Sequence, residues 1–198
     1  MSSSINSTRV KGIIFFALLF GCARGIESNA QSTRQTQQPD NKSWQEFVST
    51  EGRFSVLMPD TPEETFVPIQ GQFVNTEGHA YFVKTNVASY AVLYADFPDT
   101  WKDTELVKTA FDSGRDRLLA TGMVHLVSEK DIGTVNLPGR EYVIDDGAQM
   151  MKNRVYYRNG RLYQVIFLSP QVNGMSAELV KFYDGLSSKF FSSFKFKT

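Results

Sequence analysis

The feature that most constrains the fold is a pair of alternating runs near the end of the chain. Residues 149–158 and 161–168 alternate between polar and apolar side chains, and Asn159-Gly160 joins them. Both residues of this dipeptide tolerate the positive φ angle that a two-residue turn needs, so it is a strong hairpin signal. Such a turn sets Arg158 opposite Arg161. The sequence therefore predicts an antiparallel hairpin whose register is determined by its turn.

Other short runs, separated by Gly, Pro and Asn, predict further strands. They cover residues 54–58, 64–69, 79–84, 90–97, 124–128, 132–136 and 140–145. Pro59 ends the first run, because proline cannot donate to a strand ladder. Runs 79–84 and 90–97 are expected to pair as a hairpin, and Asp146-Gly147 predicts a turn before the last hairpin.

Two segments have helical spacing. Apolar residues repeat on one face of the first segment, which Thr100 or Asp103 would cap and Gly122 would close: Leu106, Val107, Ala110, Phe111, Gly114, Leu118 and Leu119. Its charged residues are expected to be solvated: Lys108, Asp112, Arg115 and Asp116. Ser176 is the predicted cap of a second helix through Leu186, before a Phe-rich tail. The order of elements predicts an α+β fold, a largely antiparallel sheet with helices packed on it.

The late hairpin has two chemically different faces. Val155, Tyr157, Leu162, Ile166 and Leu168 form an apolar face that is typical of a core. The opposite face combines three guanidiniums with two phenols, and Lys152 lies nearby: Arg154, Tyr156, Arg158, Arg161 and Tyr163. Arginine forks recognise phosphates and carboxylates, so this face is a candidate anion or partner-binding surface. The alternative is that these long side chains lie over the sheet as structural cover.

The N-terminal segment has the order of a secretory signal peptide. Arg9 and Lys11 precede the apolar run 12–20, and small residues follow. This run is far shorter than the roughly 20 residues of a membrane-spanning helix. Leu19-Phe20-Gly21-Cys22 resembles a lipoprotein box, in which Cys22 is acylated, although Phe20 is larger than the residue usual there. The alternative is cleavage after Ala23 or after Ala30.

Residues 22–43 are rich in Gln, Ser, Thr and Asn, and so cannot bury enough apolar surface to order themselves. We therefore expect a signal peptide over 1–21, a flexible polar tether over 22–43 and one α+β domain over 44–198. The alternative for the polar segment is an extended arm packed on the domain.

Charge and motifs exclude several functional classes. The 21 basic residues balance the 21 acidic ones, which gives no nucleic-acid footprint. Cys22 is the single cysteine, so the chain has neither an internal disulfide nor a thiolate metal cluster. Walker, GxGxxG, GxSxG and HExxH motifs are absent from the sequence. No catalytic residue, cofactor or metal site is therefore predicted.

The remaining chemical candidates have simpler structural explanations. His79 is expected at a strand start and His125 at the beginning of another strand, each as a structural histidine. The pairs Asp145-Asp146 and Asp96 with Asp99 lie where turn acids are expected. Trp44 and Trp101 are expected to pack on the domain, although an exposed Trp101 would indicate a contact site.

A family resemblance adds to these expectations. Residues 51–59 (EGRFSVLMP), the central helix, the Asn159-Gly160 hairpin and the Phe-rich final helix resemble the PsbP-like family. That family includes extrinsic proteins of the photosystem II oxygen-evolving complex and shares an α/β/α sandwich with the Ran-binding Mog protein. The resemblance implies a non-enzymatic domain that docks on membrane assemblies. His79 and His125 do not match the metal sites of plant members, so no functional residue is transferred.

These observations rank three functions. The first is an exported, lipid-anchored accessory or assembly protein that binds a membrane-associated protein partner and faces the periplasm, the cell surface or the thylakoid lumen. The second is a periplasmic or lumenal module for a small ligand or ion. The third is an enzyme, which the missing motifs disfavour.

Overall fold

The computed structural model describes residues 43–70, 75–97 and 104–198. Within these residues the chain forms ten strands and two helices. They are, in order, β1 (Gln45–Ser49), β2 (Phe54–Met58), β3 (Glu63–Gln70), β4 (Asn75–Lys84), β5 (Ser89–Asp96), α1 (Thr104–Leu119), β6 (His125–Asp131), β7 (Gly139–Asp145), β8 (Gln149–Arg158), β9 (Arg161–Pro170), α2 (Ala177–Ser193) and β10 (Lys195–Phe196).

Seven strands form one antiparallel sheet in the order β3-β4-β5-β9-β8-β7-β6. Most neighbouring strands of this sheet also follow one another in the chain. The exception is the pair β5 and β9, which are neighbours in the sheet although α1 lies between them in the sequence. Asn159 has a φ of 52° and Gly160 a φ of 76°, as the predicted turn requires. The register sets Arg158 opposite Arg161, which confirms the predicted hairpin.

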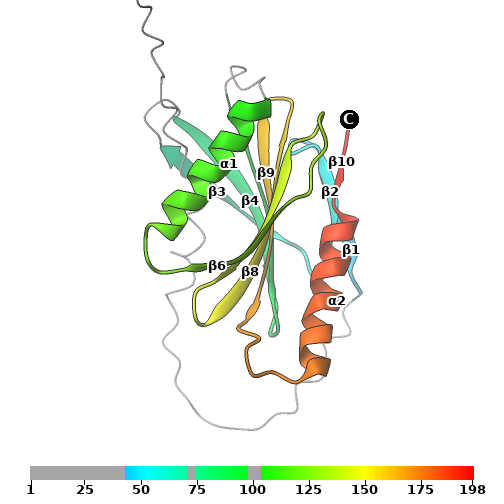
Figure 1. Ribbon diagram of the computed structural model, residues 1–198. Helices are drawn as coiled ribbons and strands as arrows, with labels where there is room; N and C mark the ends of the chain where they lie inside the picture. The colour runs from blue at the N-terminus through cyan, green and yellow to red at the C-terminus, as the bar shows by residue number, and fades with distance from the viewer. Residues whose placement is uncertain (1–42, 71–74, 98–103) are drawn as a thin grey trace, which may run out of the picture.

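The two faces of this sheet have different covers (Figure 1). On one face, Val107, Phe111 and Leu118 of α1 pack in a buried apolar cluster with side chains of the sheet. On the other face, α2 packs together with a small sheet of order β1-β2-β10. Phe54 and Phe190 are fully buried in this second cluster. The result is the predicted α+β fold, with helices on both faces of a largely antiparallel sheet.

The second helix begins as the sequence predicts and continues further. Ser176 is its N-cap and accepts a hydrogen bond from the Leu179 amide at 3.4 Å. The helix ends at Ser193, so part of the predicted Phe-rich tail is helical, including the buried Phe190 and Phe191. The following strand β10 places Phe196 opposite Phe54. The tail therefore completes the small sheet.

Two strand predictions differ from the structure. Strand β1 was not predicted, because QEFVS has only two apolar residues, and it forms through pairing with β2. Residues 132–136 were predicted as a strand and instead form a loop, closed by an isolated bridge between Thr134 and Leu137. Gly133 explains this loop, because an added Cβ would lie 2.2 Å from the Gly139 nitrogen.

Several sequence predictions lie outside the described residues. These are the signal peptide, Cys22 and most of the tether, together with Asp99, Trp101 and the proposed α1 caps Thr100 and Asp103. The three-part division of the chain therefore stays a prediction. Neither helix in the described part of the chain has the length and apolar character of a membrane span.

Candidate functional site

The sequence-predicted Arg/Tyr face lies under the C-terminal part of the chain. Tyr163 is only 2% exposed, and its ring meets that of Phe196 at 5.1 Å. Tyr156 stacks on Phe194 with 6.1 Å between ring centroids. Burial raises the pKa of Tyr156 and of Tyr163, so both phenols keep their protons at neutral pH. The two phenols are therefore packing groups of the second core.

Arg154 also has a structural role. Its Nε donates to a Glu141 carboxylate oxygen at 2.6 Å, and its guanidinium lies 4.4 Å from the centre of the Phe191 ring. Lys130 contacts the other oxygen of Glu141 at 2.8 Å. Lys152, which the sequence placed near this face, pairs with Asp184 of α2 at 2.7 Å. These cations are neutralised where the sheet meets α2.

Arg161 holds the end of the hairpin. Its guanidinium donates to both carboxylate oxygens of Asp96, at 2.6 and 2.7 Å, and to the main-chain carbonyl of Glu51. It also lies 4.5 Å from the centre of the Tyr94 ring. The hydrogen bonds from Arg161 lower the pKa of Asp96. Asp96 is therefore explained by this bidentate pair.

Arg158 differs from these neighbours. Its guanidinium lies 5.0 Å from the centre of the Phe196 ring, and this contact holds the side chain without neutralising it. Arg53 lies in the turn before β2. The Lys197 amide donates to the Arg53 carbonyl at 2.8 Å, and this hydrogen bond holds the turn beside the C-terminal residues, which also lie near Arg158. In the part of the chain that the structure describes, no carboxylate lies within ion-pair distance of Arg53 or Arg158.

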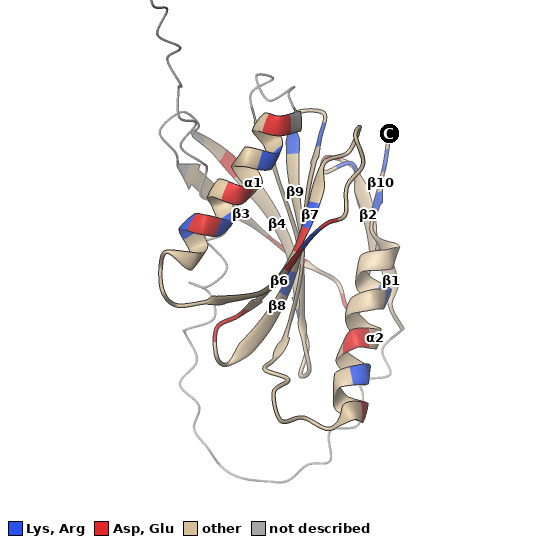
Figure 2. Ribbon diagram, in the orientation of Figure 1, with Lys and Arg blue, Asp and Glu red and all other residues tan. Residues whose placement is uncertain are grey.

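These residues surround a hollow of about 380 Å³, which we call the arginine hollow. Its lining consists of Arg53, Asp96, Arg158, Asn159, Arg161, Tyr163, Lys197 and Thr198. Asp96 is already engaged by Arg161, and the Lys197 ammonium lies 3.7 Å from a carboxylate oxygen of the exposed Glu46. Basic residues also mark β10 beside the C-terminus in Figure 2. Four cationic side chains against one carboxylate side chain give the lining an excess of positive charge, which suits an oxyanion.

The sequence indicated this hollow only in part. Arg158, Arg161 and Tyr163 were predicted from the hairpin and do line it, whereas Arg154 and Tyr156 are not among its lining residues. Arg53 and Lys197 were missed. No local pattern could have found them, because β2 and β10 join the hollow through pairing across most of the chain.

The structure places both histidines in strands of the large sheet. His79 was expected at a strand start but lies inside β4, because that strand begins four residues earlier. Its ring stacks on Tyr94 at 4.8 Å with an interplanar angle of 5°, and Glu64 is 3.5 Å away. His125 begins β6 and is exposed. Within the described ranges, no group of three His, Cys, Asp or Glu side chains is placed to hold a metal ion.

Asp145 and Asp146 are turn acids, as predicted. Asp145 accepts from the Gly147 amide at 2.7 Å, and Asp146 accepts from the Ala148 and Gln149 amides. These contacts satisfy main-chain donors in the turn between β7 and β8. Asp145 also accepts a hydrogen bond from the Gln171 side chain.

Trp44 packs at the opposite end of the small sheet. Its ring meets Tyr90 edge-on at 5.2 Å, and the Lys189 ammonium lies 4.7 Å from its centre. Trp44, Tyr90, Phe182 and Leu186 line part of a second hollow, with a volume of about 240 Å³. This partly apolar hollow is a secondary candidate for a small ligand.

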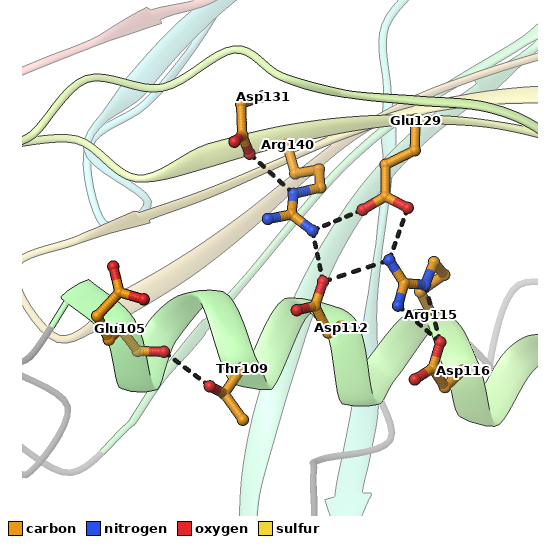
Figure 3. Close-up of polar contacts among 8 residues, drawn as sticks. All are labelled: Glu105, Thr109, Asp112, Arg115, Asp116, Glu129, Asp131 and Arg140. Carbon is orange, nitrogen blue, oxygen red and sulfur yellow. Dashed lines mark hydrogen bonds and ion pairs between the residues drawn. The ribbon is translucent and has the colours of Figure 1, made fainter.

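The prediction that the α1 charges are all solvated was wrong. Figure 2 shows acidic and basic residues alternating along α1, and Figure 3 shows that several of them meet charges of β6 and β7. Arg115 contacts Glu129 at 2.6 Å, and Arg140 contacts Glu129 at 2.5 Å. Arg140 also pairs with Asp112. Helical spacing could not reveal these partners, because β6 and β7 supply them.

Comparison with known proteins identifies the fold. No protein-family model matches the chain, and no curated protein matches it. The chain is similar to the solution structure of cyanobacterial PsbP (CyanoP) from Synechocystis sp. PCC 6803, with a TM-score of 0.51 and 14% sequence identity. The match covers 78% of this chain and 93% of that chain. At this identity the likeness shows the fold alone, and it confirms the predicted PsbP-like fold.

Proposed function

We propose that this chain, whose fold is PsbP-like, is an exported accessory or assembly protein that acts by protein contacts at a membrane. In this proposal Cys22 is acylated and anchors the chain, while the arginine hollow docks an acidic surface of a membrane-associated protein partner. No catalytic step is part of the proposed role. The site of export is the periplasm, the cell surface or the thylakoid lumen.

The observation that carries this proposal is the contrast among the arginines at the arginine hollow and on the neighbouring face of the large sheet. Arg154 and Arg161 each have a carboxylate partner within 2.6 Å, whereas Arg53 and Arg158 have none among the described residues. A guanidinium that is held in place but not neutralised can form a charge-assisted, bidentate contact with an incoming carboxylate. Complementary charges also increase the association rate of protein partners.

The fold and the leader support the same role. PsbP-like proteins include extrinsic proteins of a membrane complex, and the resemblance therefore favours docking over catalysis. The leader and the lipoprotein-like box predict a chain that is exported and then held at a membrane. Acyl chains stabilise such an attachment by about 0.8 kcal/mol for each buried methylene group.

The hollow can be tested by crosslinking in native membranes. We compare the full-length chain with an Arg53→Gln/Arg158→Gln variant and with a matched control, Arg117→Gln/Lys181→Gln, in which two exposed cations outside the hollow are removed. Truncation of anchor arginines in protein interfaces typically costs more than about 1 kcal/mol each. We therefore expect a roughly tenfold or greater loss of partner crosslinks in the hollow variant only.

The same experiment contains the outcomes that decide the proposal. Partner crosslinks should weaken as the salt concentration rises, because the contact is electrostatic. Equal crosslinking of the hollow variant and the wild-type chain would show that the partner binds elsewhere. Absence of any membrane partner for the wild-type chain would refute the accessory role itself.

A second candidate function rests on the hollow beside Trp44. Its aromatic and aliphatic lining, with Lys84 and Asp60 also present, suits a small amphipathic ligand. A ligand there would raise the unfolding temperature of the wild-type chain, and Trp44→Leu would abolish that rise. If no compound of a broad panel has this effect, the small-ligand function loses its only structural support.

A further inference from the structure

The loop between β6 and β7, residues 132–138, is closely held by hydrogen bonds. The Ile132 and Gly133 amides both donate to the Gly139 carbonyl, at 3.0 and 3.1 Å. Thr134 and Leu137 exchange amide-to-carbonyl hydrogen bonds at 2.8 and 3.2 Å. These contacts fold the loop back on itself, so its apex has a defined conformation.

Glycine makes this conformation possible. A Cβ at Gly133 would meet the Gly139 nitrogen at 2.2 Å and the Leu137 carbonyl oxygen at 2.5 Å, distances that main-chain atoms cannot accommodate without moving. The two sides of the loop are therefore in direct contact. Such a loop presents its apex with little conformational entropy left to lose on binding.

The apex of this loop is apolar and exposed. Val135 is 85% exposed, the highest value among the large hydrophobic side chains that the structure describes as exposed. Leu137 and Pro138 are half-buried and extend the apolar surface of the loop. A single exposed valine on a protein surface is common. Val135 is informative because it lies on a closely held loop near the strand end that contributes Arg158 to the arginine hollow.

The loop lies at the same end of the large sheet as the turn between β8 and β9 (Figure 1), and Arg158, Asn159 and Arg161 of that turn line the arginine hollow. The Tyr157 amide donates to the Pro138 carbonyl at 3.1 Å, and Gly139 pairs with Tyr156. Arg158 directly follows Tyr157, on a strand that neighbours β7 and therefore lies about 4.8 Å from it. Loop 132–138 and Arg158 of the arginine hollow therefore lie on adjacent strands, at the same end of the sheet.

We infer that loop 132–138 and the arginine hollow form one docking surface for a protein segment that carries an acidic side chain close to an apolar side chain. The hollow takes the carboxylate, and the apolar side chain packs on Val135. This inference rests on the proposed function and specifies the partner chemistry. Charge directs the segment to the surface, and apolar contact then slows its release.

The test uses the full chain carrying Cys22→Ser, so that an acyl group does not interfere, and two synthetic eight-residue peptides of equal charge. One peptide has an Asp-Glu pair followed three residues later by Leu, and in the other this Leu is Ser. Binding is followed by amide chemical shifts in NMR titrations. We expect the Leu peptide to bind about tenfold more tightly, with shifts at loop 132–138 and around Arg158.

Variants separate the two contacts. Val135→Ser should remove the advantage of the Leu peptide and leave binding of the Ser peptide unchanged. Arg53→Gln/Arg158→Gln should weaken both peptides. Val127→Ser, which changes another exposed valine (56% exposed) on the edge strand β6, is the matched control and should change neither.

Each contrary outcome has a defined meaning. Equal binding of the two peptides to the wild-type chain would overturn the role of Val135 and leave the proposed function standing. If neither peptide binds, the arginine hollow does not bind acidic side chains. This outcome would refute both the docking surface and the basis of the proposed function. Val135-dependent binding to phosphatidylglycerol vesicles would assign the loop to a lipid surface and overturn this inference.

Discussion

Arginine residues on a single sheet face have different roles here, and their neighbours decide which. Arg154 and Arg161 are surrounded by carboxylates and aromatic rings, and they join the sheet to α2 and to the small sheet. Arg158 contacts an aromatic ring and, among the described residues, has no carboxylate within ion-pair distance, so its charge remains available. The same residue type therefore serves packing at one position and keeps its charge available at the next.

Glu141 gives a pH prediction at the residue scale. Burial alone would raise the pKa of this carboxyl, but hydrogen bonds from Lys130 and Arg154 outweigh it and lower the pKa. A lowered folded-state pKa stabilises the protein above the unfolded value of about 4.3, and this contribution is lost as the pH falls through the folded-state pKa. Ionised Glu141 therefore favours the folded state at neutral pH.

We expect Glu141→Gln to lower the free energy of unfolding by about 1 kcal/mol at pH 7 and to lessen the decline of this free energy as the pH falls below about 4.3. The effect is modest because Lys130 is 61% exposed and water screens its charge. Urea denaturation at several pH values measures both quantities. Exposed Glu77 provides the control substitution Glu77→Gln. A pH dependence as steep as that of the wild-type chain would refute this role for Glu141.

At the scale of elements, ion pairs attach α1 to the edge of the large sheet. Arg140 of β7 contacts Asp112 of α1 as well as Glu129 and Asp131 of β6, and its side chain is only 12% exposed (Figure 3). Arg115 of α1 reaches Glu129 in return. A charge network therefore holds α1 against β6 and β7, in addition to the apolar contacts of the helix.

Removal of the central cation should loosen this attachment. We expect Arg140→Met to lower the free energy of unfolding by about 1–3 kcal/mol, because three carboxylates lose a shared partner in a half-buried site. Lys108→Met, which breaks only an exposed pair with Glu105, should change it by less than about 0.5 kcal/mol. Urea denaturation of both variants provides the comparison. Similar small effects would show that the network adds little to stability.

At the scale of the whole molecule, the small sheet lies between the point where the predicted tether would join the domain and the proposed docking surface. In β1, Gln45 pairs with Met58 and Ser49 pairs with Phe54. Trp44, where the predicted tether ends, therefore lies at the Met58 end of β2, whereas Arg53 and the hollow lie at the other end. A tether attached there would leave the hollow facing away from the point of attachment.

Membrane attachment is the prediction that belongs to this scale. We expect the native chain to carry a lipid on Cys22 and to fractionate with membranes, and Cys22→Ser to become soluble without loss of folding. Two or more acyl chains are needed for stable anchoring, so removal of their attachment site should release the protein. Intact mass and membrane fractionation measure this directly. A soluble native chain that begins near Ala30 would refute the anchor and leave a free exported domain.

The elements whose signals are local could be predicted from the sequence. The Asn159-Gly160 turn set the register of β8 and β9, Ser176 marked the start of α2, and the turn acids Asp145 and Asp146 were identified correctly. These signals work because φ preferences, capping and side-chain alternation act over a few neighbouring residues. The order of these elements along the chain predicted the α+β class, and the resemblance to the PsbP-like family rested on the same order and on residues 51–59.

Tertiary structure alone decided which charged residues remain free. The pairing of β2 with β10 brings Arg53 beside Lys197, and the C-terminal aromatic residues cover Tyr156 and Tyr163. Asp112 and Arg115 have the spacing of solvated helix residues, yet they meet Glu129 and Arg140. The physical reason is that a charge is neutralised by its neighbours in space. Those neighbours come from distant parts of the chain, so no local pattern contains them.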